Sequence, residues 1–160
     1  MRFVNVIAAI AFLVPASALA KSDIIRIDVN RGAKSIATID RPETARQFSI
    51  WSGPGTSGGK VTGERDFIDW AAGAVEAPAA ALARYGVSFY CEPPRAGEPP
   101  RKCYVVHYVF DAAQKRGFIY LPAPGEPNYR LNVSSLIHDV EGSWFRATPQ
   151  WDQLMRAATT

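Results

Sequence analysis

Two histidines, and the acidic side chains that follow one of them, are the residues that could carry acid–base chemistry. His138 is followed by Asp139 and Glu141 in a segment with loop composition, so we expect this cluster to be open to solvent. A histidine beside carboxylates can act as a general acid or base. His107 lies within an apolar stretch and is expected to be a hydrogen-bonded residue of the core or of a sheet edge. His138, Asp139 and Glu141 are therefore the candidate catalytic residues.

No metal-site motif accompanies these residues. The chain contains no H-E-x-x-H sequence. Its two histidines lie far apart, and a zinc site would also need carboxylates that the sequence does not locate. We therefore predict no metal centre, and no spacing favours a Ser-His-Asp triad.

A glycine-rich segment at residues 53–58 fits the G-x-G-x-x-G pattern of dinucleotide-binding loops. That function requires a helix directly after the glycines, and the polar residues around Gly59 and Gly63 do not favour one. A phosphate-binding loop is not indicated either, because Val61 follows Lys60 where Ser or Thr is required. We predict a surface loop and no cofactor.

Aromatic residues beside turns form the candidate binding surface. Trp51, Trp70 and Trp144 each lie near Gly or Pro, and Tyr129 follows a Pro-rich turn. Aromatic side chains at the ends of a sheet can stack on sugar rings or anchor a protein partner. They can equally fill the ends of a small core, which is the commoner role. Trp151, on the apolar face of a predicted helix, is expected to be buried.

Cys91 and Cys103 are the only cysteines and are predicted to form a disulfide bond. They flank a Pro-rich segment with strand-like sequence on both sides. Eleven residues separate them, whereas redox and metal-binding pairs are commonly separated by two. A bridge of this span stabilises a fold by about 3 kcal/mol in the chain-entropy model. An even number of cysteines is typical of proteins in oxidising compartments.

Short strands separated by Gly/Pro turns are the elements that must position these residues. Alternation of apolar and polar residues predicts a strand over 25–30. Thr148 and Pro149 predict the start of a C-terminal helix. Further strands are expected over 34–39, 47–51, 85–91, 103–110, 117–121, 129–133 and 143–147. The pattern predicts a mostly β fold, a single-domain antiparallel sandwich or open barrel with a short C-terminal helix.

Residues 1–20 have the organisation of a signal peptide. Arg2 precedes an unbroken apolar run, and small residues end the segment where signal peptidase requires them. Cleavage is expected between Ala20 and Lys21, leaving a single β-rich domain of residues 21–160. The apolar run is about half of the length that a membrane span needs, so we expect no span in the mature chain. We expect this domain in the periplasm or the secreted fraction.

The charge pattern does not favour nucleic acid or a membrane surface as partner. The formal net charge of the whole chain is +3. The leader contains one of the 18 basic residues, so 17 remain beside 15 acidic ones. Along the sequence they form no cluster larger than the pairs Arg101-Lys102 and Lys115-Arg116. Domains that bind nucleic acid or anionic lipid concentrate their basic residues.

Five segments, which together cover most of residues 21–160, carry a resemblance. They are QFSIWSGPG at 47–55, RYGVSFYC at 84–91, YVVHYVFD at 104–111, GFIYLPAPGEPNYRLN at 117–132 and EGSWFRATPQWD at 141–152. They resemble small exported proteins of unassigned function from Gram-negative bacteria. The resemblance implies a periplasmic or secreted setting and no particular activity. The S-G-x-x-Y loop of periplasmic lysozyme inhibitors is not present.

These observations lead us to expect an exported non-catalytic domain that binds a protein or glycan partner in the cell envelope. The alternatives are a small periplasmic hydrolase acting on an envelope polymer, or an inhibitor of a periplasmic enzyme. The hydrolase hypothesis requires His138 and a carboxylate to meet in a concave pocket. The binding hypothesis requires the loops that carry Trp51 and Trp144 to form a contiguous exposed apolar patch.

Overall fold

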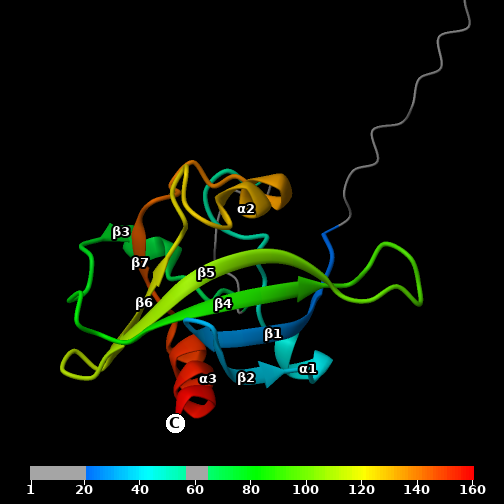
Figure 1. Cartoon of the computed structure of the whole chain (residues 1–160). Helices are drawn as coiled ribbons and strands as arrows, with labels where there is room; N and C mark the ends of the chain where they lie inside the picture. Colours follow the sequence, from blue (N-terminus) through cyan, green and yellow to red (C-terminus); the bar gives the residue numbers. More distant parts are fainter. Residues whose placement is uncertain (1–20, 57–64) are drawn as a thin grey trace, which may run out of the picture.

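The computed structural model describes residues 21–56 and 65–160, which contain one antiparallel sheet of seven strands (Figure 1). The predicted signal peptide with its cleavage site after Ala20, and the loop residues 57–64, lie outside the described residues. The order across the sheet is β2-β1-β4-β5-β6-β7-β3. The strands are β1 Ile24–Arg31, β2 Lys34–Ile39, β3 Ala74–Val75, β4 Arg84–Cys91, β5 Arg101–Asp111, β6 Arg116–Tyr120 and β7 Trp144–Arg146.

The prediction of a mostly β antiparallel domain with a short C-terminal helix is confirmed. All strands of the described residues belong to one sheet that is not closed into a barrel, so the sandwich alternative does not apply. The helical elements are α1 Pro42–Ala45, the 3-10 turn η1 Trp70–Ala72, α2 Tyr129–Ser135 and α3 Pro149–Thr159. Figure 1 shows α3 below the sheet and α2 above it.

Helix α3 begins as its sequence predicts. Thr148 is the N-cap, and its side chain accepts a hydrogen bond from the backbone N–H of Trp151 at 3.3 Å. Pro149 occupies the first turn, where its missing N–H costs nothing. The helix places Trp151 and Met155, both fully buried, against the core face of the sheet. The prediction that Trp151 is a core residue is confirmed.

The predictions of two strands were wrong. Residues 47–51 contain no strand, although Ser49 N–H donates a hydrogen bond to the carbonyl oxygen of Arg65. Residues 129–133 belong to α2 rather than to a strand. Their apolar residues alternate over only five positions, and so short a pattern also fits a helical turn. Tertiary contacts of α2 with β5 decide between the two structures.

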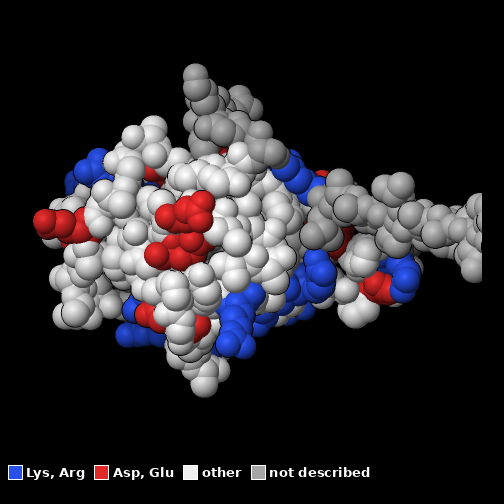
Figure 2. All heavy atoms as spheres, turned by 90° about the horizontal axis from the view of Figure 1, so that it is seen from above, with Lys and Arg blue, Asp and Glu red and all other residues white. Residues whose placement is uncertain are grey.

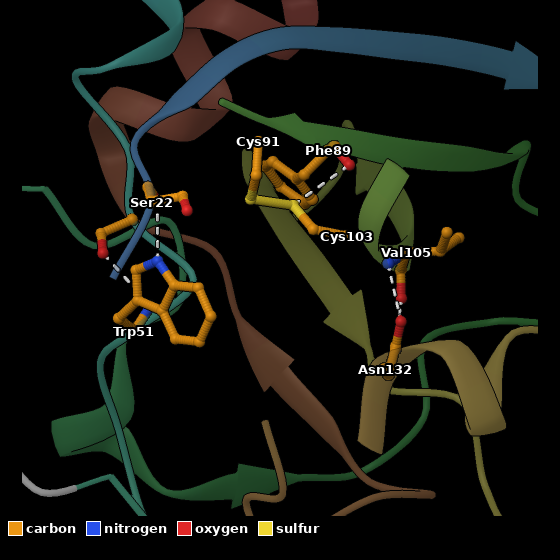
Figure 3. The surroundings of a disulfide bond; sticks show 8 residues. Ser22, Trp51, Phe89, Cys91, Cys103, Val105 and Asn132 are labelled. Atoms are coloured by element: carbon orange, nitrogen blue, oxygen red, sulfur yellow. Dashed lines mark hydrogen bonds between the residues drawn. A yellow bond between two sulfur atoms is a disulfide. The ribbon is translucent and has the colours of Figure 1, made fainter. Parts of the chain in front are cut away.

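Asn132 on α2 supplies the decisive contact. Its side-chain Oδ1 accepts a hydrogen bond from Val105 N at 2.8 Å, and its Nδ2 donates one to Val105 O at 2.7 Å (Figure 3). Asn132 is completely buried and Val105 nearly so. β6 pairs with β5 only from His107 onward. The Asn132 amide therefore bonds to the backbone N–H and C=O of Val105 at a place where β6 offers no partner.

The predicted disulfide bond between Cys91 and Cys103 is confirmed, and it joins the adjoining ends of β4 and β5 (Figure 3). The two Cα atoms are 5.8 Å apart, and both residues are buried. The bridge closes the base of the Pro-rich loop of residues 92–100, which extends away from the sheet at the right of Figure 1.

Candidate functional site

A row of side chains crosses the sheet on the face opposite the core. The strand register places Gly86 of β4 opposite His107 of β5, His107 opposite Tyr120 of β6, and Tyr120 opposite Trp144 of β7. Residues directly opposite on neighbouring strands point to the same face. Gly86 leaves open space beside His107, because a Cβ there would meet only the carbonyl oxygen of Asn30, at 4.0 Å.

The rings in this row contact one another. The centroids of His107 and Tyr120 are 6.1 Å apart, and those of Tyr120 and Trp144 are 5.1 Å apart. The Tyr120 hydroxyl donates a hydrogen bond to Glu126 Oε2 at 2.9 Å, which fixes the end of the central ring. Glu126 also accepts a hydrogen bond from Ala123 N–H, and this bond is the main reason that the pKa of Glu126 is lowered. The carboxylate is therefore ionised at neutral pH.

Arg84, at the start of β4, lies over two of these rings. Its guanidinium carbon is 4.9 Å from the centroid of Tyr120 and 5.3 Å from that of Trp144. Cation–π contact of this kind holds a long side chain in place while leaving its N–H groups available. Arg84 is exposed, and in the described chain no carboxylate lies within 4.0 Å of it. We call Arg84, His107, Tyr120, Glu126 and Trp144 the aromatic platform.

The platform combines apolar ring surface with unused polar groups. Trp144 and His107 are half-buried, while Tyr120 is 9% exposed beneath Arg84. Among the described residues no protein group accepts a hydrogen bond from Trp144 Nε1. By contrast, Trp51 Nε1 donates to Ser22 O at 2.9 Å (Figure 3). A ligand can contact the exposed parts of Trp144 and His107 and hydrogen-bond to the polar groups beside them.

The four aromatic residues expected on a binding surface occupy separate places. Trp51 lies near the disulfide bond and Ser22, and Tyr129 begins α2. Trp70 packs on the core side of β7 against Phe145, with ring centroids 5.0 Å apart. Trp144 alone belongs to the platform.

Arg84, His107 and Tyr120 join Trp144 in the platform, and sequence analysis did not find them as a group. His107 and Tyr120 belong to predicted strands, and Arg84 directly precedes the strand predicted over 85–91, but nothing in the sequence joined the three. Which of their side chains face each other depends on strand register.

The predicted catalytic cluster has a different environment from the one expected. His138 was expected to be open to solvent, and this was wrong, because only 1% of it is exposed. Residues 53–56 pack over it, and its Nδ1 donates a hydrogen bond to Pro54 O at 2.8 Å. Gly55 makes this approach possible, since it has a φ of 71° and any Cβ would collide with the backbone of Ile137.

The carboxylates of this cluster do not bond to the imidazole. Glu141 Oε1 accepts a hydrogen bond from the backbone N–H of His138 at 2.7 Å, and Asp139 is exposed. The ring of His138 packs against Trp70, with centroids 4.8 Å apart. Burial lowers the pKa of His138, so the folded protein holds it neutral. These contacts tie two loops together.

Acidification is expected to reduce stability. Burial lowers the pKa values of both His138 and His107. Below pH about 6.5 the unfolded chain gains protons that the folded chain does not, so the free energy of unfolding decreases as the pH falls. Each histidine adds at most about 1.4 kcal/mol per pH unit to this slope. Urea unfolding at pH 7.5, 6.5 and 5.5 measures how the free energy of unfolding depends on pH. A slope unchanged in His138→Gln would contradict the assignment for His138.

Two further features of the described residues concern metals and membranes. Within 21–56 and 65–160, no group of three or more His, Cys, Asp or Glu residues is arranged to hold a metal ion. In the same residues, no helix has the length and apolar character needed to cross a bilayer. On the face seen in Figure 2 uncharged residues predominate, and most Lys and Arg side chains lie toward the edges.

No family model matches the chain, and no curated protein or solved structure matches it either. The geometry of the aromatic platform is therefore the basis on which we propose a function.

Proposed function

We propose that this chain is an exported, non-catalytic domain that binds a glycan of the cell envelope through the aromatic platform. The observation that carries the proposal is the position of Arg84, which lies over the rings of Tyr120 and Trp144 with no carboxylate within 4.0 Å of it among the described residues. A guanidinium held in this way presents donors beside apolar ring surface. Sugar rings need this combination, because they carry C–H faces and polar hydroxyl or acidic substituents.

The direction of the row also suits a polymer. Neighbouring strands are about 4.8 Å apart, so the row offers rings at regular intervals perpendicular to the strands. An extended glycan would lie across β5, β6 and β7. Glu126 at one side can accept hydrogen bonds from hydroxyl groups, and Trp144 Nε1 can donate one.

Export is supported by the disulfide bond between Cys91 and Cys103, since such bonds persist in oxidising compartments. The hydrolase alternative receives no such support. His138 is buried, and its Nδ1 is engaged with Pro54 O. A general base must reach the proton that it removes. We therefore favour binding over catalysis.

Replacing Trp144 by alanine is expected to weaken glycan binding at least about tenfold, because the stacking surface at the end of the row is lost. The disulfide-intact protein is tested on an array of bacterial polysaccharides and soluble muropeptides, and affinities for the retained glycans are measured by calorimetry. Arg84→Gln is expected to have a similar effect. Trp144→Phe keeps a ring and should bind with intermediate affinity.

Arg31→Gln is the matched control, because Arg31 is an exposed strand arginine outside the platform. Its affinity should equal that of the unsubstituted protein. Unfolding curves of each variant show whether the fold is intact. The proposal is refuted if the unsubstituted protein retains no glycan, or if folded Trp144→Ala binds glycan as tightly as the unsubstituted protein does.

A further inference from the structure

A groove of about 720 Å³ lies where α3 meets the turn between β5 and β6 and the end of β7. None of the platform residues lines it. Its charged lining residues are Asp69, Lys115, Arg116, Arg146, Asp152 and Arg156. The groove is thus a second surface, separate from the aromatic platform.

Basic residues from four parts of the fold line this groove. Lys115 belongs to the β5–β6 turn, Arg116 begins β6, Arg146 ends β7, and Arg156 lies in the last turns of α3. Across residues 21–56 and 65–160, no carboxylate lies within 4.0 Å of any of the four. Like charges this close together repel one another, and a bound anion removes that repulsion.

The two carboxylates in the groove are engaged by neutral donors instead. Asp69 caps η1 by accepting a hydrogen bond from Ala72 N at 3.2 Å. Asp152 Oδ1 accepts one from the Tyr108 hydroxyl at 2.9 Å, and its Oδ2 accepts one from Gly117 N at 2.9 Å. Burial raises the pKa of Asp152. These contacts hold Asp69 and Asp152 against the fold, and neither carboxylate comes within 4.0 Å of the four cations.

The same contacts hold the groove in shape. Asp152 fastens α3 to β5 through Tyr108 and to β6 through Gly117. Gly117 has no room for a side chain, because a Cβ there would collide with Asp152 Oδ1 and with the ring of Tyr108. The missing side chain at position 117 therefore lets Asp152 and Tyr108 approach the backbone of β6. The cations are presented on a preformed surface, which lowers the entropic cost of binding.

One end of the groove is aromatic. The guanidinium of Arg156 lies 5.1 Å from the ring centroid of Phe110. A second cavity of about 260 Å³ shares Phe110, Arg156 and Thr160 with the groove and adds Tyr85. A ligand can therefore place charged groups among the cations and an uncharged portion along these rings.

We infer that the α3 groove binds a soluble oligoanion that carries phosphate or carboxylate groups. Three arginines can each offer two parallel N–H donors to such a group, and Lys115 adds a compact charge. Four cations that form no close ion pair in the described residues match a ligand of several negative charges better than a ligand with one. The site is independent of glycan binding at the platform.

Titration calorimetry with tripolyphosphate and with citrate tests the inference on the disulfide-intact protein. We expect at least one probe to bind, with an affinity that falls as salt is added. Arg146→Gln combined with Arg156→Gln should weaken binding at least about tenfold. Asp69→Asn removes a negative charge but keeps an oxygen that can cap η1, so it should strengthen binding about two- to fivefold. Such a gain cannot arise from misfolding.

The matched control is Arg31→Gln combined with Lys34→Gln, which removes two exposed charges at the β1–β2 turn. It should leave the affinity unchanged, as should Trp144→Ala. The inference is overturned if neither probe binds, or if the control pair weakens binding as much as the groove pair. Capture by phosphatidylglycerol vesicles without binding of either soluble probe would also overturn it, because it would indicate a diffuse surface attraction.

Discussion

Replacing Trp151 with alanine is expected to lower the free energy of unfolding by about 4 kcal/mol. The indole is fully buried, and it contacts the rings of Phe48, Phe67 and Phe89 at centroid distances of 4.8, 5.3 and 5.6 Å. Removing it leaves a cavity at the junction of α3 and the sheet. Guanidinium unfolding followed by circular dichroism measures the loss.

Two companion variants make this result interpretable. Trp151→Phe should cost much less than Trp151→Ala. It keeps most of the apolar contact, and it removes a buried Nε1 to which no described protein group offers an acceptor. Trp144→Ala should also cost less, because Trp144 is half-buried on the opposite face. A loss below about 1 kcal/mol for Trp151→Ala would mean that α3 does not complete the core.

Replacing Asn132 with alanine is also expected to cost about 4 kcal/mol. The change leaves the backbone N–H and carbonyl groups of Val105 without hydrogen-bond partners, and each unsatisfied buried group costs about 1 to 3 kcal/mol. Because the residue is completely buried, water cannot replace the amide without a rearrangement of α2. Chemical unfolding measures the cost, and amide hydrogen exchange at Val105 should accelerate.

Asn132→Asp separates the two hydrogen bonds. An aspartate still accepts a hydrogen bond from Val105 N, but it cannot donate one to Val105 O. Its second carboxylate oxygen would then face the carbonyl oxygen of Val105, so the loss of unfolding free energy should remain large. Ser134→Ala on the exposed side of the same helix is the control, with a loss within about 0.5 kcal/mol. Equal stabilities of Asn132→Ala and Ser134→Ala would show that the bridge contributes nothing.

The regular parts of the fold could be predicted because their sequences contain periodic patterns. β1 alternates cleanly between apolar and polar residues, and α3 has a cap, a first-turn proline and one apolar face. The α2 segment could not be predicted in this way. Its five alternating residues suit a strand equally well, and the outcome depends on Asn132 reaching Val105, a partner 27 positions away.

The candidate sites depended on contacts between distant residues. Arg84 and Trp144 are 60 positions apart, and only the strand register brings them together. The pair Lys115-Arg116 was visible in the sequence, but Arg146 joins it through the pairing of β7 with β6, and Arg156 through the packing of α3. His138 was misjudged because its loop looks polar, while residues 53–56 that cover it come from far earlier in the chain.

The sulfur bridge at the base of the Pro-rich loop has a consequence for proteolysis. Residues 94–100 are exposed and lie outside the sheet, so an enzyme can reach the peptide bond after Arg95 without disturbing any strand. A chain nicked there would remain a single covalent molecule, since Cys91 and Cys103 join the fragments on either side of the cut. The nick would become visible as two shorter polypeptides only after reduction.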